Sequence, residues 1–125
     1  MYEIGVQREF IAQHFLSGDD FGPEGELHSH HYVVEVTLQG AALNELGFLT
    51  DISKVHAALG NVVRRYADEN LNELPELDGG NPSLERFAAA IAEQLRPSLL
   101  VDGIQRAQVT LWEDPTAWAR FTFEA

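Results

Sequence analysis

Three histidines lie in a pattern that predicts a metal site. His28 and His30 are separated by one residue at the start of the alternating run 33–39. Side chains two apart on a strand share a face, so these two imidazoles project together. His14 closes an earlier segment that also has the pattern of a strand and could pair with this one. Zinc favours imidazole ligands, and a catalytic zinc site typically takes three protein ligands, so we expect a three-histidine zinc site.

Another interpretation stays open for the H-x-H pair taken alone. Paired histidines on a strand also occur as ordinary hydrogen-bonded residues of the surface or the core. The upstream His14 is what favours a metal site. The other two histidines are expected to have no part in it. His31 points to the opposite side of the strand, and His56 falls on the polar side of a predicted helix, where a solvated role is expected.

Two long strands are expected to carry these histidines. The residues from 2 to 15 alternate in polarity, which is typical of a strand. The segment 17–23 is rich in turn-forming residues and leads to a second strand over about residues 28–39. One face of that second strand begins with two imidazoles and continues with the side chains of Tyr32, Val34, Val36 and Leu38.

Two helices are expected next. Behind Asp51, a good N-cap residue, apolar side chains recur at three- and four-residue steps from residue 52 to residue 66. The acidic segment 68–80 indicates a loop. The segment Asn81-Pro82-Ser83 predicts the start of the second helix, with a cap residue and then proline at the first helical position, and Pro97 predicts its end.

The chain closes with two shorter strands, at about residues 107–113 and 118–123. The resulting order ββααββ predicts an α+β fold, an antiparallel four-stranded sheet with both helices on one face. At 125 residues the chain has the size of one domain, so we expect a single domain over residues 1–125.

Composition excludes several functions. The chain has 8 Lys and Arg against 20 Asp and Glu, a formal charge of -12, which argues against nucleic acid or an anionic membrane surface as a partner. It has no cysteine, so it has neither disulfides nor a catalytic thiol, as is common in the cytoplasm. No export signal and no apolar run of roughly 20 residues is visible. We therefore expect a cytoplasmic protein.

Six short segments form an ordered set along the chain. They are Phe10-x-Ala12-x-His14, Leu27-His28-Ser29-His30-His31-Tyr32, Gly47-Phe48-Leu49-Thr50-Asp51-Ile52, Leu71-Asn72, Asn81-Pro82-Ser83-Leu84-Glu85 and Trp112-Glu113-Asp114-Pro115. In the same order they resemble F-x-A-x-H, L-H-G-H-N-Y, G-M-V-x-D-F, the end of L-D-H-x-x-L-N, N-P-T-x-E and E-T-P. These are motifs of the 6-pyruvoyltetrahydropterin synthase and 6-carboxytetrahydropterin synthase family, and the resemblance covers nearly the whole chain.

The resemblance implies a fold, an assembly and a site. The fold is the tunnelling fold, whose subunits close into a barrel of strands, typically a homo-hexamer of two trimers with pterin sites at the subunit interfaces. The resemblance also implies that His14, His28 and His30 bind Zn²⁺ and that Glu113 anchors the pterin. A carboxylate suits that role because it accepts two parallel hydrogen bonds from the amino and ring N–H groups. Ser83 stands at the family's threonine and is a second candidate contact with the ring.

The sequence departs from the family at the catalytic positions. The family's cysteine stands four residues before the first histidine of its H-G-H motif, and here that position is Glu24. Ala67 and Asp68 stand where the family has its Asp-His pair. Ser29 replaces a glycine, and His31 replaces an asparagine. These changes argue against the family's usual reactions.

Two functions remain open. In the first, Glu24 is a substitute general base, and zinc acidifies the side-chain hydroxyls of a dihydroneopterin-type substrate, so that the protein is a carbon–carbon or carbon–oxygen lyase. Some family members with glutamate at this position are associated with aldolase-like cleavage to 6-hydroxymethyl-dihydropterin. In the second, the protein binds a pterin without catalysis, with or without zinc. Glu26 is an alternative base if the loop register shifts.

Overall fold

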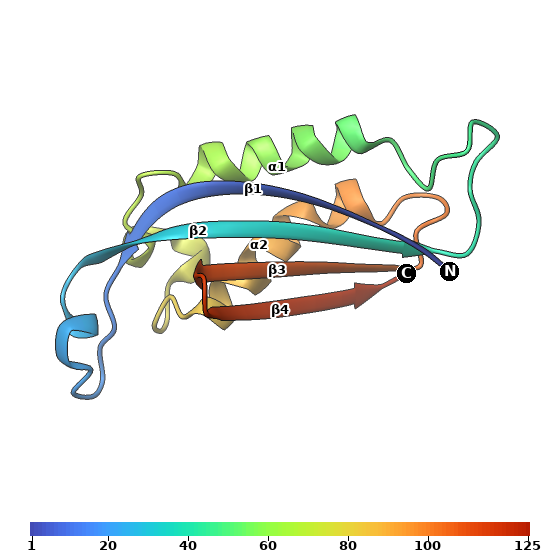
Figure 1. Ribbon diagram of the computed structural model, residues 1–125. Coiled ribbons are helices and arrows are strands. Elements are labelled where there is room, and N and C mark those ends of the chain that lie inside the picture. Colours follow the sequence, from blue (N-terminus) through green and yellow to red (C-terminus); the bar gives the residue numbers. More distant parts are fainter.

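Four strands form one antiparallel sheet, and two helices form a second layer (Figure 1). The computed structural model describes residues 1–125, the whole chain. In sequence and in space the strands follow the order Tyr2–His14 (β1), His28–Gly40 (β2), Arg106–Asp114 (β3) and Ala117–Glu124 (β4). Every neighbouring pair is antiparallel. The predicted α+β class and the ββααββ order are confirmed.

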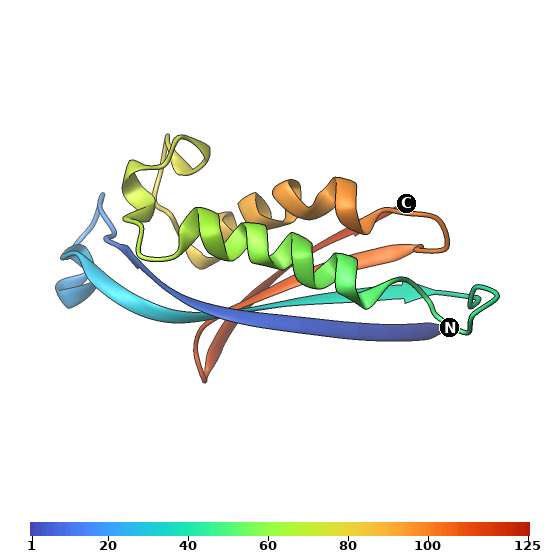
Figure 2. The same ribbon diagram turned by 90° about the horizontal axis from the view of Figure 1, so that it is seen from above.

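The register of β1 and β2 determines where the histidines meet. His14 pairs with His28, and Ala12 pairs with His30. The three imidazoles therefore lie at one end of the sheet, where β1 ends and β2 begins. Both chain termini lie at the opposite end (Figures 1 and 2).

The helices Ile52–Tyr66 (α1) and Leu84–Leu99 (α2) lie on the same face of the sheet (Figure 2). Asp51 caps α1 as expected, because its side chain accepts a hydrogen bond from the Ser53 N–H. Neither helix combines the length and the apolar character needed to cross a bilayer. Side chains of both helices belong to the same buried cluster as side chains of the sheet.

The predicted ends of α2 were wrong at both sides. The N-cap is Ser83, whose side chain accepts from the Arg86 N–H, so the helix starts after the predicted Asn81 cap. Asn81 instead uses its side chain to bind a distant backbone. Pro97 lies inside the last turn, and the helix continues to Leu99. A proline there removes one hydrogen bond, and the buried Leu99 holds the turn against the sheet.

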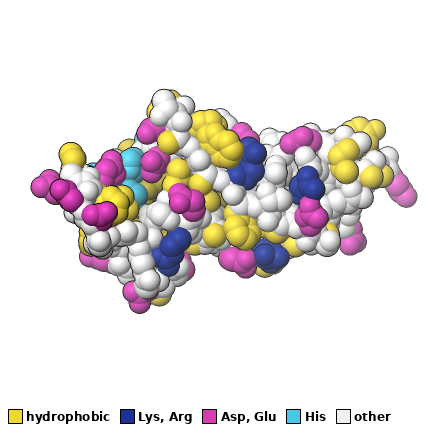
Figure 3. Space-filling view, turned by 90° about the horizontal axis from the view of Figure 1, so that it is seen from below, with side chains coloured by type: hydrophobic (Ala, Val, Ile, Leu, Met, Phe, Trp, Pro, Cys, Tyr) yellow, Lys and Arg dark blue, Asp and Glu magenta, His cyan; other side chains and the backbone are white.

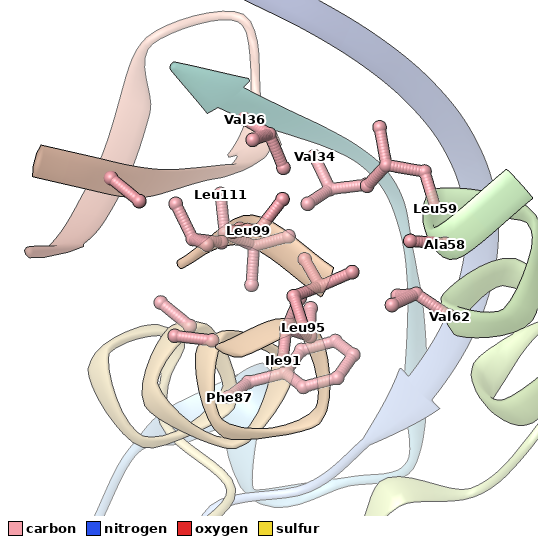
Figure 4. Packing of buried hydrophobic residues seen from close by; sticks show 14 of the residues in the cluster. Val34, Val36, Ala58, Leu59, Val62, Phe87, Ile91, Leu95, Leu99 and Leu111 are labelled. Carbon is pink, nitrogen blue, oxygen red and sulfur yellow. The ribbon is translucent and has the colours of Figure 1, made fainter. Parts of the chain in front are cut away.

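The core lies between the sheet and the helices. Only one sheet face is covered, so buried side chains alternate with more exposed ones along much of β1, β2 and β3, while Ser29 and His31 on the other face are exposed. Figure 4 shows side chains of both layers packed together, namely Val34, Val36 and Leu111 from the sheet with Ala58, Leu59, Val62, Phe87, Ile91, Leu95 and Leu99 from the helices. This packing fixes the sheet end that carries the histidines.

The segment between the helices, expected to be a plain loop, is partly packed. It contains two 3-10 turns, Leu71–Glu73 and Pro75–Leu77. It buries three leucines at three-residue steps, Leu71, Leu74 and Leu77. Arg65 of α1 holds it through a two-point ion pair with Glu76, at 2.8 and 3.0 Å. Its acidic composition concealed this apolar spacing.

Candidate metal centre and ligand pocket

Three imidazole rings converge at the start of β2. The ring centroids lie 4.6 Å apart for His14 and His28, 5.0 Å for His14 and His30, and 4.8 Å for His28 and His30. The Nε2 atoms of His28 and His30 are 3.1 Å apart. Two nitrogens on one tetrahedral zinc ion lie about 3.3 Å apart when each is roughly 2.0–2.1 Å from the metal. The pair therefore has the spacing of two ligands of one ion.

His14 presents a buried nitrogen with no protein partner. Its side chain is almost fully buried, and its Nδ1 lies 2.9 Å from the carbonyl oxygen of Pro82. A carbonyl oxygen can only accept, so Nδ1 carries the proton and Nε2 keeps a free lone pair. That Nε2 makes no hydrogen bond. Burial lowers the pKa of His14 below its usual value, which favours the neutral ring that a metal needs.

His28 is oriented in the same manner. Its Nδ1 lies 2.7 Å from the carbonyl oxygen of Glu26, which leaves the Nε2 lone pair facing the cluster. Metal-binding histidines usually donate their second ring N–H to a carbonyl or a carboxylate in this way. Sequence reasoning missed both carbonyl acceptors, because a backbone acceptor leaves no mark in residue type. The only sequence feature that could have indicated the Glu26 contact is its position two residues before His28.

Glu24 adds a carboxylate to the cluster. Its Oε2 lies 2.9 Å from Nε2 of His28. One ligand atom each from His14, Glu24, His28 and His30 lies within 4.8 Å of the others. Three imidazole nitrogens are a donor set that a catalytic zinc ion accepts, so the histidines fit zinc, and the Glu24 carboxylate lies beside them. Of the two glutamates in question, Glu24 brings its side chain to the cluster, whereas Glu26 brings its backbone carbonyl.

Ala67 and Asp68 lie outside this group of ligand atoms. Ala67 is the C-cap of α1. Asp68 is exposed and has a φ of 64°, a left-handed conformation that aspartate tolerates better than most residues. Its backbone N–H donates to the carbonyl of Ile11. The segment where the family resemblance placed an Asp-His pair therefore supplies a backbone contact instead of an acid or base.

A pocket of about 710 Å³ opens beside the cluster, and both His30 and Glu113 line it. Glu113 Oε2 lies 3.8 Å from Nε2 of His30. Burial raises the pKa of Glu113, and this effect outweighs the opposing effect of the neighbouring His30. Trp112 gives the pocket a flat aromatic wall, and no lysine or arginine lines it. Figure 3 shows histidine side chains at the surface at this end of the molecule, with acidic side chains close by.

Two other residues of the sequence analysis have different surroundings. Ser83 does not line this pocket, and its hydroxyl caps α2. His31 lies on the opposite face from the other two histidines of β2, as expected, and its Nε2 is 3.4 Å from Glu9 Oε2. His31 nevertheless lines the pocket from that face, which the sequence analysis did not anticipate.

The chain is similar to known proteins over most of its length. The model of the family described as 6-pyruvoyl tetrahydropterin synthase matches residues 3–124. A 6-pyruvoyl tetrahydrobiopterin synthase from Dictyostelium discoideum is 36% identical over 74 residues, which cover 58% of this chain and only 55% of that relative. A putative 6-carboxy-5,6,7,8-tetrahydropterin synthase from Pyrococcus horikoshii is 25% identical over 138 residues, covering 93% of this chain and 87% of the relative.

Solved structures share the fold at low identity. The crystal structure of 6-pyruvoyl tetrahydropterin synthase from Plasmodium vivax has a TM-score of 0.83 and 18% identity, with 99% of this chain and 98% of that chain covered. The same Plasmodium vivax protein has also been solved with a catalytic glutamate replaced by alanine, at a TM-score of 0.80 and 17% identity, with the same coverage. The match across residues 3–124 shows that the chain belongs to the 6-pyruvoyl tetrahydropterin synthase family.

Proposed function

We propose that this protein is a zinc-dependent lyase that cleaves the hydroxylated side chain of a reduced pterin, with Glu24 as the base. The observation that carries the proposal is the position of the Glu24 carboxylate, 2.9 Å from His28 within a group of three histidines. A base must lie within hydrogen-bond reach of the proton that it removes, and a ligand held at the histidines would be in reach of Glu24. The Plasmodium vivax relative also has a catalytic glutamate.

The pocket supports a pterin as the ligand. Glu113 lies on β3 in a partly buried position and can accept two hydrogen bonds from the amino and ring N–H groups of a pterin. His30 lies between Glu113 and the other two histidines, so a bound ring would direct its side chain toward Glu24. Ser83 is a weaker candidate for a ring contact because its hydroxyl already caps α2.

The proposed chemistry is a retro-aldol cleavage. Zinc bound by the three histidines would acidify the side-chain hydroxyls of the substrate. Glu24 removes the proton from one hydroxyl, that oxygen becomes a carbonyl, and the adjacent C–C bond breaks. The electron pair passes to the carbon attached to the pterin ring, which takes a proton back from Glu24. The products are a 6-hydroxymethyl pterin and an aldehyde, so the step needs no oxidant or reductant.

A second function is favoured by one observation. The side chain of Glu24 is 52% exposed, and burial is what usually makes a carboxylate a stronger base. The alternative is therefore a non-catalytic pterin-binding protein that uses Glu113 and the pocket without turnover. In that case Glu24 is a loop carboxylate, and zinc has a structural role or none.

The experiment combines metal analysis with turnover. Protein purified without chelator is analysed for zinc and then incubated with 7,8-dihydroneopterin, and the products are separated by chromatography. We expect one zinc per chain, formation of a 6-hydroxymethyl pterin, and loss of turnover in Glu24→Gln with pterin binding retained. Pterin binding without turnover in the native protein would establish the non-catalytic alternative. The absence of both zinc and turnover would overturn the lyase.

We also propose that the protein acts as a homo-hexamer of two trimers. Apart from a single bridge between Gln13 and Asn70, the outer edges of β1 and β4 are unpaired within the chain, and such edges readily pair with another strand. Strand pairing between subunits would close the sheets into a barrel. Light scattering coupled to size-exclusion chromatography tests this assembly, and a monomer at micromolar concentration would contradict it.

A further inference from the structure

The three residues that follow His14 are each fixed by a specific hydrogen bond. The side-chain amide of Asn72 binds both backbone groups of Phe15, at 2.9 and 3.1 Å. The N–H of Leu16 donates to the Glu24 carbonyl at 2.9 Å. Beyond Leu16, Asn81 binds Ser17 as Asn72 binds Phe15, with both distances 2.9 Å. Two asparagine side chains thus hold the chain just beyond β1, where the backbone contacts of Ile11 and Gln13 with residues 68–70 end.

The Asn81 contact lies one residue from the carbonyl that orients His14. Asn81 is fixed through its side chain to Ser17, and its own carbonyl accepts a hydrogen bond from Arg86 Nη1 at 2.9 Å. The ring of Pro82 fixes its φ and restricts the residue before it. Ser83 is held in turn as the N-cap of α2. The direction of the Pro82 carbonyl is therefore determined on both sides.

That carbonyl has one function in the cluster. It accepts from Nδ1 of His14 at 2.9 Å, and the ring then presents its buried Nε2 to the other ligand atoms. A shift of Pro82 would rotate the His14 ring or remove the bond that selects its tautomer. Loss of such an outer partner typically weakens metal affinity by about 10–100-fold.

We propose that Asn81 is a positioning residue of the metal centre, because its side chain holds the Pro82 carbonyl against His14 and so keeps Nε2 aimed at the cluster. The inference rests on the proposed metal-dependent function. Replacing Asn81 should therefore weaken zinc binding more than it lowers the stability of the zinc-free protein. A purely structural asparagine would change only the stability of the loop.

Asn44 is a matched control for this distinction. Its Oδ1 also accepts two backbone hydrogen bonds, from the N–H groups of Leu46 and Phe48, both at 3.0 Å. It lies in the loop before α1 and has no contact with the histidine cluster. Asn44→Ala and Asn81→Ala therefore remove comparable loop contacts, and only the second is expected to alter the metal centre.

The test measures zinc affinity by competition with a chromophoric chelator, and unfolding of the zinc-free protein in EDTA. We expect about 10–100-fold weaker zinc binding for Asn81→Ala, an altered visible spectrum of its Co²⁺ form, and less than a twofold change for Asn44→Ala. Asn81→Asp keeps the acceptor for Ser17 N–H but loses the donor, so it should weaken zinc binding by about tenfold even if the alanine variant folds poorly.

The outcomes separate the two levels of the proposal. Unchanged zinc affinity in a folded Asn81→Asp, with tight binding by the native protein, would overturn the role of Asn81 and leave the metal-dependent function standing. An equal loss of affinity in Asn44→Ala would also overturn it, because the effect would then be general destabilisation. A native protein that binds no zinc would overturn the metal-dependent function and this role with it.

Discussion

Two walls enclose the histidine cluster, and they differ in burial. The inner wall, residues 68–83, runs between α1 and α2 and buries Leu71, Leu74, Leu77 and Pro82. The outer wall, residues 17–27, connects β1 to β2 and contains no buried residue. The inner wall supplies the carbonyl that orients His14, and the outer wall supplies the Glu24 carboxylate.

The difference separates two tasks within one site. A metal ligand must hold its geometry, and the proposed ligand His14 is tied to a wall whose apolar side chains are packed against the core. A base must reach a substrate that enters from solvent, so an exposed turn is a suitable place for it. His28 connects the two, because it lies beside both His14 and Glu24. The following predictions test this division.

The largest expected effects come from removing ligands on the two sides. His14→Ala and His28→Ala should each weaken zinc binding by more than ~100-fold, because even outer partners are worth about 10–100-fold. Only His14→Ala should also destabilise the zinc-free protein, by about 1–3 kcal/mol, because it leaves the buried Pro82 carbonyl unpaired. Chelator competition and denaturant unfolding in EDTA measure the two quantities. Equal destabilisation by both variants would contradict the division between the walls.

The next effect distinguishes the two carboxylates with proposed roles, Glu113 as the pterin anchor and Glu24 as the base. Glu113→Gln should weaken pterin binding by about 10–100-fold, since hydrogen bonds to a charged group contribute roughly 1.5–3 kcal/mol and each 1.4 kcal/mol is tenfold. Glu24→Gln should leave pterin affinity within about threefold of the native value, because its task is proton transfer. Calorimetric titration with a non-cleavable pterin tests both. Equal losses would show that both glutamates anchor the ring.

A smaller effect concerns the ion pair that fixes the inner wall. The hydrogen bonds from Arg65 lower the pKa of Glu76 to about 2. Since its folded pKa lies below its unfolded value, Glu76 stabilises the protein above about pH 4.5, and this stabilisation is lost as the pH falls from there toward 2. Both side chains are partly exposed, so Glu76→Gln should cost about 1 kcal/mol at pH 7. The difference should shrink on acidification, and a constant difference from pH 7 to pH 3 would contradict this cause.

The smallest effect is expected at Glu26. Its carbonyl orients His28, but its side chain is exposed and does not belong to the group of possible ligand atoms. Glu26→Gln should therefore change zinc affinity and turnover by less than about twofold, well within the range of surface substitutions. Steady-state turnover beside Glu24→Gln makes the comparison direct. A loss of turnover in Glu26→Gln instead would transfer the role of base to Glu26.

Much of the fold was predictable because it follows from local periodicity. Polar and apolar residues alternate along β1 and β2, and apolar residues recur at three- and four-residue steps along α1. Each pattern indicates which side of the element is buried, and the structure confirms these three elements. The end positions of α2 were less predictable. Asn81 and Ser83 are both good cap residues, and the choice between them depends on Ser17, which lies far away in sequence. Local signals alone do not resolve such a competition.

The site shows the same limit. Residue types and spacing were sufficient to select His14, His28 and His30, because strand geometry places H-x-H side chains on one face and antiparallel pairing brings His14 opposite. Which of Glu24 and Glu26 brings its side chain to the cluster depends on the 3-10 turn Gly22–Gly25, which places the Glu24 carboxylate beside His28.

The sequence by itself determined the family, the order of the elements and the candidate ligands, since these depend on side-chain chemistry and short-range periodicity. Only the tertiary structure decided how the ligands are held. The carbonyls of Pro82 and Glu26 orient the rings, and the amides of Asn72 and Asn81 hold the chain beyond His14. Backbone acceptors are identical at every residue, so their partners become visible only when distant segments have packed together.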